Sequence, residues 1–237
     1  MVGTGATAFS TILNAGGATA SSCGLALGTN IPATFAYQTT NPSTNQATGT
    51  LNTPVNIAVG SGQSYVFAIT PTAAFNATDV VINANCSNAN PGPVITGVTT
   101  LLLSASNTPV PDIVALAATT SHDGIANIPG ANGTGAFSVA SVNVGSSSSI
   151  TVAADTGSAS LPVSINLCQT NSSAQCTSPL APTVTTTINA NATPTFSVFV
   201  TGSANVPFDP GNNRVFVRFK DSAGVVRGAT SVAVRTQ

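Results

Sequence analysis

The two halves of the sequence resemble each other at a nearly constant spacing of about 131 residues. A chain rich in Ala, Thr and Ser matches itself often by chance, but one spacing kept over about sixty residues predicts two homologous modules. Gly3-Thr4-Gly5 and Phe9 also match Gly133-Thr134-Gly135 and Phe137, with a small change of register. The main matches pair Tyr37-Gln38-Thr39 with Cys168-Gln169-Thr170, Ile57 with Ile188, Tyr65 with Phe196, Thr70 with Thr201, and Val94, Gly97 and Thr99 with Val225, Gly228 and Thr230.

The polar residues predict what kind of secondary structure fills these modules. All 6 acidic residues are Asp, only 5 residues are basic, and the remaining polar positions are mostly Thr, Ser and Asn. Helices expose Glu, Lys, Gln and Arg, whereas Thr, Ser and Asn favour strands, turns and loops. With 15 Pro and 21 Gly, the chain is predicted to be all-β. A hydrophobic content of 42% and a net charge of −1 argue against disorder.

Alternation of apolar and polar residues is clearest near the C-terminus. It predicts a strand over Arg214–Lys220, a turn at Asp221–Gly224 and a returning strand that contains Ser231–Arg235. Strands are also predicted at Tyr65–Ile69, Val80–Cys86 and Asp112–Thr119. The residues expected to face the core are Val215, Val217, Phe219, Val232 and Val234, whereas Arg214, Arg218 and Lys220 are expected to face solvent.

Strands at this spacing, separated by Gly, Pro and Asn turns, predict two tandem immunoglobulin-like antiparallel β-sandwiches, with jelly rolls or barrels as alternatives. Module one is expected over residues 1–106, a proline-containing linker over 107–111, and module two over 112–237. Module one has no counterpart of Asp112–Thr119. Either it lacks its first strand, or the segment comes from inside a tandem array; the second explanation is favoured, with Met1 as an added start residue.

The four cysteines form one pair in each module. Cys23 and Cys86 are 63 positions apart, the separation expected of a bond between the two sheets of an immunoglobulin-like sandwich. A bond between Cys168 and Cys176 would instead close a short polar loop after a strand. Pairing within modules favours two disulfides and an oxidising compartment over four free thiols. No zinc site is expected, because the spacing fits no Cys-x-x-Cys pattern and the chain has 1 His.

Motifs for catalysis are missing from the sequence, so we expect no enzyme, no cofactor and no metal. His122 lies in the polar turn Thr120-Ser-His-Asp-Gly124, where a solvated side chain is expected rather than a catalytic one. Asp209-Pro-Gly-Asn-Asn213 has oxygen donors for calcium, but one carboxylate is too little charge for tight binding, and a plain turn is predicted.

All five basic residues lie close together near the C-terminus, at Arg214, Arg218, Lys220, Arg227 and Arg235. On neighbouring strands they would form a candidate patch for an anionic polymer such as an acidic polysaccharide. The simpler interpretation, which we favour, is an outer sheet kept soluble by positive charge. Nucleic acid is not an expected partner.

The stretch from Phe196 through Phe208-Asp-Pro-Gly-Asn-Asn-Arg-Val-Phe-Val-Arg-Phe-Lys-Asp221 to Arg235 resembles repeat modules of large secreted bacterial surface proteins. Asp112-Ile-Val-Ala-Leu-Ala117 and Asn127-Ile-Pro-Gly130 resemble them too. These modules are immunoglobulin-like, adhesin-like and mostly uncharacterised, so the resemblance implies a fold class and an extracellular or cell-surface location, and contains no binding motif. The export signal is expected outside residues 1–237, and no run of the sequence is long and apolar enough to span a membrane.

Three functions are compatible with these features. The first is a non-enzymatic structural or adhesion module, a tandem spacer of a surface protein. The second is a filament or surface-layer subunit that assembles with copies of itself by strand addition. The third is a binding module for a glycan or an anionic polymer, which the absence of Trp and the presence of only 2 Tyr disfavour. The partner is therefore a surface protein, a glycan or the chain itself.

Overall fold

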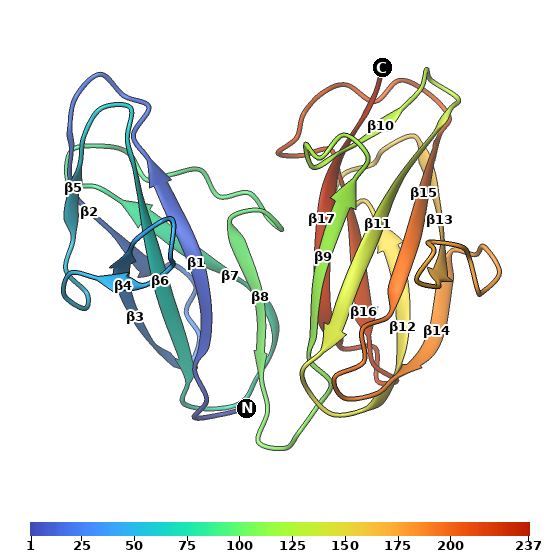
Figure 1. Cartoon of the computed structure of the whole chain (residues 1–237), viewed down its shortest axis with the longest axis horizontal. Helices are drawn as coiled ribbons and strands as arrows, with labels where there is room; N and C mark the ends of the chain where they lie inside the picture. The colour runs from blue at the N-terminus through green and yellow to red at the C-terminus, as the bar shows by residue number, and fades with distance from the viewer. The chain divides into compact units, whose positions relative to one another are not determined.

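The computed structural model describes residues 1–237 and consists of β-strands joined by turns and loops, with no helix (Figure 1). The chain divides into two compact units. Unit 1 comprises Met1–Val94 and Val98–Thr108, and unit 2 comprises Ile95–Gly97 and Pro109–Gln237. The predicted all-β class is confirmed, and each unit is a sandwich of two sheets. No helix of the structure could cross a membrane.

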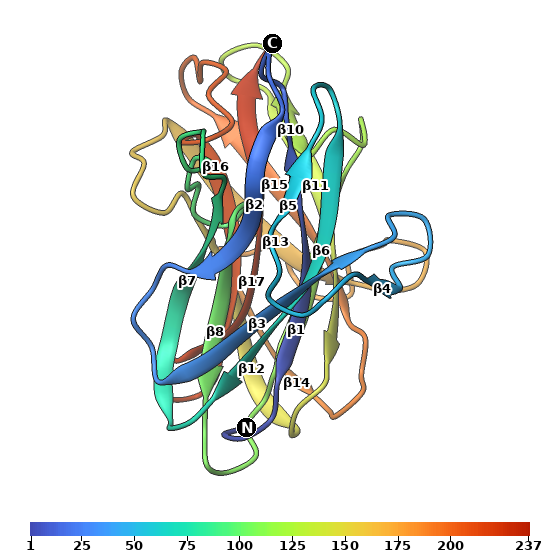
Figure 2. The ribbon, with the colours of Figure 1, turned by 90° about the vertical axis from the view of Figure 1, so that its left-hand side faces the viewer.

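Unit 1 contains two four-stranded sheets in which every strand pair is antiparallel. The hairpin of β3 and β4 extends from the side of the unit in Figure 2. One sheet has the order β1 (Ala6–Leu13), β6 (Gly62–Pro71), β3 (Ala33–Thr40) and β4 (Ala47–Thr48). The other has the order β5 (Val55–Ile57), β2 (Ala20–Leu27), β7 (Phe75–Asn85) and β8 (Thr100–Ala105).

The core of unit 1 is built around its two tyrosines. Tyr65 is fully buried, and its ring meets that of Tyr37 edge to face at a centroid distance of 5.8 Å. The Tyr65 hydroxyl donates a hydrogen bond to the Cys23 carbonyl at 3.0 Å, which satisfies the polar end of a buried aromatic side chain. Ile69 and Val80 close the core from the two sheets.

Burial of these tyrosines predicts that unit 1 is sensitive to alkali. Burial, followed by the charge of Tyr37, raises the pKa of Tyr65 to about 12, and burial also raises the pKa of Tyr37. A phenol with a higher pKa in the folded state stabilises the fold fully below pH 10, and this contribution disappears as the pH rises toward 12. Denaturant unfolding of unit 1, followed by tyrosine circular dichroism, should therefore show stability decreasing between pH 10 and 12.

Tyr65→Phe is the control for this prediction. It should weaken unit 1 at neutral pH, because the Cys23 carbonyl loses its buried donor, at a cost of about 1–3 kcal/mol. It should also reduce the loss of stability between pH 10 and 12. A wild-type stability that stays constant over this range would contradict the assignment.

Unit 2 contains a four-stranded and a five-stranded sheet. All pairs are antiparallel except β10 and β17, which are parallel. The first sheet has the order β13 (Val163–Thr170), β15 (Thr195–Gly202), β11 (Thr134–Asn143) and β9 (Ile113–Thr119). The second has the order β10 (Ile125–Ile128), β17 (Val226–Thr236), β16 (Arg214–Lys220), β12 (Ser148–Asp155) and β14 (Thr183–Ile188).

The inward residues predicted for the C-terminal hairpin are confirmed. Val215, Val217 and Phe219 on β16 and Val232 and Val234 on β17 are all buried. Phe219 meets Phe196 of the opposite sheet edge to face, with ring centroids 5.7 Å apart. The contact joins the two layers of the sandwich at their centre.

The strand order of unit 2 follows the immunoglobulin pattern with one difference. In the order β9, β11, β15, β13 the first sheet corresponds to strands A, B, E and D, and β12, β16 and β17 of the second correspond to C, F and G. β10 lies beside β17 as a second part of the first strand. The difference is β14, which follows β13 in the chain but pairs with β12.

The strand ladders locate the repeat more finely than the sequence does. Phe67 pairs with Ala8 and Tyr37, and Val198, 131 positions later, pairs with Phe137 and Leu167. The equivalent of Phe137 is therefore Ala8, so the match of Phe9 to Phe137 is wrong. Phe9 is 56% exposed because it points to the outer face of β1. The equivalent of Tyr37 in the ladder is Leu167, one residue before Cys168.

Candidate functional site

The basic residues of β16 and β17 lie close together, as the sequence predicts, but they do not all face solvent. Arg214 is buried, and so is Phe216, two residues further along the same face of β16. Its guanidinium donates hydrogen bonds to the Ser231 hydroxyl and to the carbonyls of Pro210 and Ser231. The expectation that Arg214 faces solvent is wrong, and burial lowers the pKa of this guanidinium.

Arg218 and Arg227 each pair with a carboxylate of their own unit. Arg218 Nε lies 2.7 Å from Asp155 Oδ2, and Arg227 Nε lies 2.7 Å from Asp221 Oδ2. Burial raises the pKa of each carboxyl, but hydrogen bonds from the arginine and from backbone N–H groups outweigh it, so both pKa values lie below the usual one. Both carboxylates are therefore ionised at neutral pH, and they neutralise much of the positive charge.

Arg235 lies over the ring of Phe208, with its guanidinium carbon 5.0 Å from the ring centroid, and donates a hydrogen bond to Asn127 Oδ1. Lys220 is half-exposed at the end of β16. Four of the five basic side chains thus have acceptors or carboxylates within unit 2. The structure consequently favours a structural role for this cluster, and the anionic-ligand patch stays a prediction.

The Cys23–Cys86 disulfide lies within one sheet. β2 and β7 pair antiparallel with Gly24 opposite Asn85, so Cys23 lies opposite Cys86 with the two Cα atoms 4.0 Å apart. The prediction that this disulfide joins the two sheets of the sandwich is therefore wrong. The separation of 63 residues reflects a long excursion of the chain through four strands of unit 1 before it returns beside β2.

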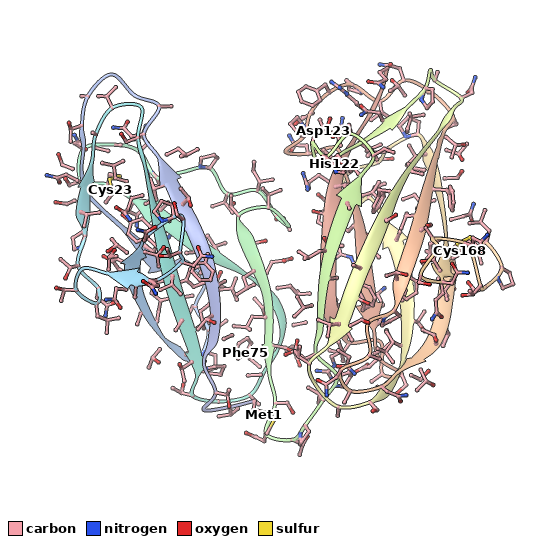
Figure 3. The ribbon with its side chains drawn as sticks, in the orientation of Figure 1. Met1, Cys23, Phe75, His122, Asp123 and Cys168 are labelled. Carbon is pink, nitrogen blue, oxygen red and sulfur yellow. A yellow bond between two sulfur atoms is a disulfide. The ribbon has the colours of Figure 1, made fainter.

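The Cys168–Cys176 disulfide holds the loop that follows β13, as expected from the sequence. Cys168 is buried on β13, and Cys176 forms a bridge pair with Thr170. Figure 3 shows Cys168 beside this loop, which projects from the side of unit 2. The disulfide keeps the polar segment Asn171–Gln175 next to the sheet.

This stapled loop borders an open pocket of about 280 Å³ on the outer face of the sheet of β9, β11 and β13. Leu116 and Ala118 of β9, Ser138 of β11 and Ala174 of the loop line it, and Leu116 is 71% exposed. This surface is not among the sites predicted from the sequence. No sequence signal could have found it, because Ile113-Val-Ala-Leu-Ala-Ala118 is apolar on both faces of the strand, and only the burial pattern of β9 places Leu116 outside.

The two turns considered for chemistry are held by their own hydrogen bonds. His122 is exposed and has a positive φ of 57°, and it lies in the turn at the end of β9 together with Asp123 (Figure 3). Asp123 accepts hydrogen bonds from the Ser121 hydroxyl and the Ile125 N–H. Asp209 accepts hydrogen bonds from the backbone N–H and the side-chain amide of Asn212, three residues further along the chain.

No family model matches the sequence, and no curated protein matches it. Among solved structures, a variant of the major pilin subunit BcpA of Bacillus cereus is 9% identical, with a TM-score of 0.33 over 86% of this chain and 65% of the pilin. The CupB6 tip adhesin of Pseudomonas aeruginosa is 10% identical, with a TM-score of 0.28 over 100% of this chain and 92% of the adhesin. The secreted serine protease VesC of Vibrio cholerae is 11% identical, with a TM-score of 0.25 over 86% of this chain and 44% of the protease.

This chain thus spans less than two thirds of the length of the pilin. All three TM-scores are too low to define a common fold. The fold assignment accordingly rests on the strand order and pairing described above.

Proposed function

We propose that this chain is a non-enzymatic structural and adhesion module, a tandem immunoglobulin-like spacer of a bacterial surface protein. The observation that carries the proposal is its construction from two sandwiches, each with its own core and its own disulfide. Units built in this way stay folded without support from a larger domain, which is what a spacer outside the cell requires.

An extracellular or cell-surface location is part of the same proposal. Disulfides persist in oxidising compartments, and all four cysteines are paired in this structure. Only 5% of the residues are charged, and the polar residues are mostly Thr, Ser and Asn. So little charge protects poorly against aggregation in the crowded cytosol, which also favours a location outside the cell. The module would then bind a surface protein or a glycan. The outer face at Leu116 is the first surface on which to test such binding.

Size-exclusion chromatography with light scattering, followed by negative-stain microscopy of the same fractions, tests the proposal. The expected result is a single monomeric species of 23.2 kDa at all concentrations. Large ordered assemblies would contradict the spacer and make self-assembly the function. Turnover of a peptide or glycan substrate by the purified chain would contradict the non-enzymatic assignment.

A further inference from the structure

The two sheets of unit 2 differ in their charged residues. The strands of one sheet, β9, β11, β13 and β15, contain no charged residue. The charged residues in the strands of unit 2 all lie in the other sheet, at Asp155, Arg214, Arg218, Lys220, Arg227 and Arg235. The cores of protein–protein interfaces are depleted in charged residues. The outer face of the uncharged sheet is therefore the better candidate for a docking surface.

An apolar stripe runs along this outer face where β9 pairs with β11. Val114 and Leu116 point outward from β9 and are 50% and 71% exposed. Val142 and Ala140 of β11 lie directly opposite them in the ladder, so the four side chains share one face. Single exposed apolar residues are ordinary on a protein surface, whereas a contiguous apolar patch is a mark of an interaction site.

The pocket of about 280 Å³ lies beside this stripe, between Leu116 of β9 and the loop that follows β13. Small side chains form its floor, namely Ala118 on β9 and Ser138 and Ala140 on β11. Pockets for drug-sized ligands have volumes of about 300–1,000 Å³. A pocket below that range suits a single large side chain rather than a whole ligand molecule.

The loop that forms one wall of the pocket is fixed before any partner binds. The Cys168–Cys176 disulfide anchors it to β13. Within the loop, Asn171 Oδ1 accepts hydrogen bonds from the N–H groups of Ser173 and Gln175 at 2.9 and 3.0 Å. Because ordering a loop at an interface costs free energy, a wall that is already ordered favours binding.

The polar groups at the rim of the pocket are engaged with one another. The hydroxyls of Thr170 and Thr195 are hydrogen-bonded to each other at 2.7 Å. The side-chain amide of Asn171 donates to Gln175 Oε1 at 3.1 Å, and its oxygen accepts from the N–H groups of the loop. Few polar groups are thus left to bind the hydroxyls of a sugar. The methyl groups of the floor and of Leu116 instead favour an apolar occupant.

Unit 1 carries an aromatic side chain at the place of the pocket floor. Phe9 on β1 lies opposite Val66, and Ser138 on β11 lies opposite Ser197. Val66 and Ser197 are separated by 131 positions, the spacing of the repeat, so Phe9 is the equivalent of Ser138. The same outer face therefore holds a phenyl ring in unit 1 and a serine in unit 2. A ring brought by a partner would take the place in unit 2 that the Phe9 ring has in unit 1.

We propose that the outer face of β9 and β11 is a docking face for another surface protein, which inserts one aromatic side chain into the pocket. The inserted ring packs against Leu116, Ala118 and Ala140, and an uncharged segment around it covers the stripe at Val114 and Val142. An aromatic anchor in a packed pocket is the usual form of an interface hot spot. Such docking rests on the proposed adhesion function and gives the chemistry of its partner.

Titration of the full chain with N-acetyl-phenylalanine amide, followed by NMR of isotope-labelled alanine and leucine methyl groups, tests the pocket. We expect binding with a Kd on the order of 1 mM. The methyl signals that should shift and saturate are those of Leu116, Ala118, Ala140 and Ala174. N-acetyl-alanine amide, which lacks the ring, should give no saturable shift at the same concentrations.

Two phenylalanine substitutions on β11 distinguish the pocket from the rest of the face. Ser138→Phe puts the side chain of unit 1 into the pocket and should weaken probe binding at least about tenfold. Ala136→Phe adds the same ring to the same outer face outside the pocket and should leave Kd unchanged. Leu116→Ala removes one wall and should weaken binding about fivefold. Because Leu116 is mostly exposed, this variant keeps the fold intact.

Two results would overturn the proposal. One is the absence of a saturable shift up to about 10 mM phenylalanine probe, or probe binding that Ser138→Phe leaves unchanged. The other is a saturable shift of the same methyl signals with methyl glucoside and none with the phenylalanine probe, which would make the pocket a glycan site. The spacer is tested separately by light scattering. A monomeric chain without affinity for the probe still fits a spacer, whereas a chain that assembles does not, whatever it binds.

Discussion

Replacing Cys23 and Cys86 together by alanine is expected to destabilise unit 1 by about 4 kcal/mol. The disulfide closes a loop of 63 residues, and the entropy that such a crosslink removes from the unfolded chain grows with the logarithm of loop length. Unit 1 also has a small buried core, so little else offsets the loss. The measurement is urea unfolding of the full chain followed by tyrosine circular dichroism, which reports on Tyr37 and Tyr65.

The second disulfide is the matched control. Cys168 and Cys176 are separated by 8 residues, so their replacement by alanine should cost only about 2.5 kcal/mol. The loss should appear in unit 2, and the tyrosine transition should not move. Equal losses for the two pairs would show that loop length does not determine their contributions. A shift of the tyrosine transition by the second pair would show that the two units do not unfold independently.

Phe219→Ala should unfold unit 2 more readily, with a loss of about 3–5 kcal/mol. Phe219 is 0% exposed and meets Phe196 across the two sheets, so truncation leaves a cavity at the centre of the core. Differential scanning calorimetry should show one transition moved to lower temperature. The transition that coincides with the tyrosine signal of unit 1 should stay in place.

Phe208→Ala provides the comparison within the same unit. Phe208 is 58% exposed, and the Arg235 guanidinium lies over its ring, so its truncation should cost less than about 1 kcal/mol. If the two substitutions cost the same, the core of unit 2 is not organised around the Phe196–Phe219 contact.

Local alternation was sufficient to predict much of this fold. In Arg214–Lys220, Val215, Val217 and Phe219 are two residues apart, and side chains alternate across a strand, so this inward set can be read without knowing which strand lies next to it. The same reasoning places Val232 and Val234 in the core. The lack of Glu and the abundance of Thr, Ser and Asn predict strands because those preferences belong to each residue separately.

Pairing between distant strands could not be predicted in this way. The sequence shows that Cys23 and Cys86 are 63 residues apart, but only the ladder of β2 with β7 reveals that they are neighbours within one sheet. For the same reason the sequence could not place Ala8, rather than Phe9, as the equivalent of Phe137. Register is a relation between strands, and a shift of one residue moves every side chain to the other face.

The sequence by itself determined the all-β class, the inward faces of its clearest strands and the clustering of five basic residues near the C-terminus. These depend on residue preferences and short-range periodicity. Only the tertiary structure decided that Arg214 is buried, that the outer face at Leu116 borders a pocket, and that Cys23 and Cys86 join neighbouring strands of one sheet. Each of these depends on which distant segment covers a given face, and a local pattern contains no information about that.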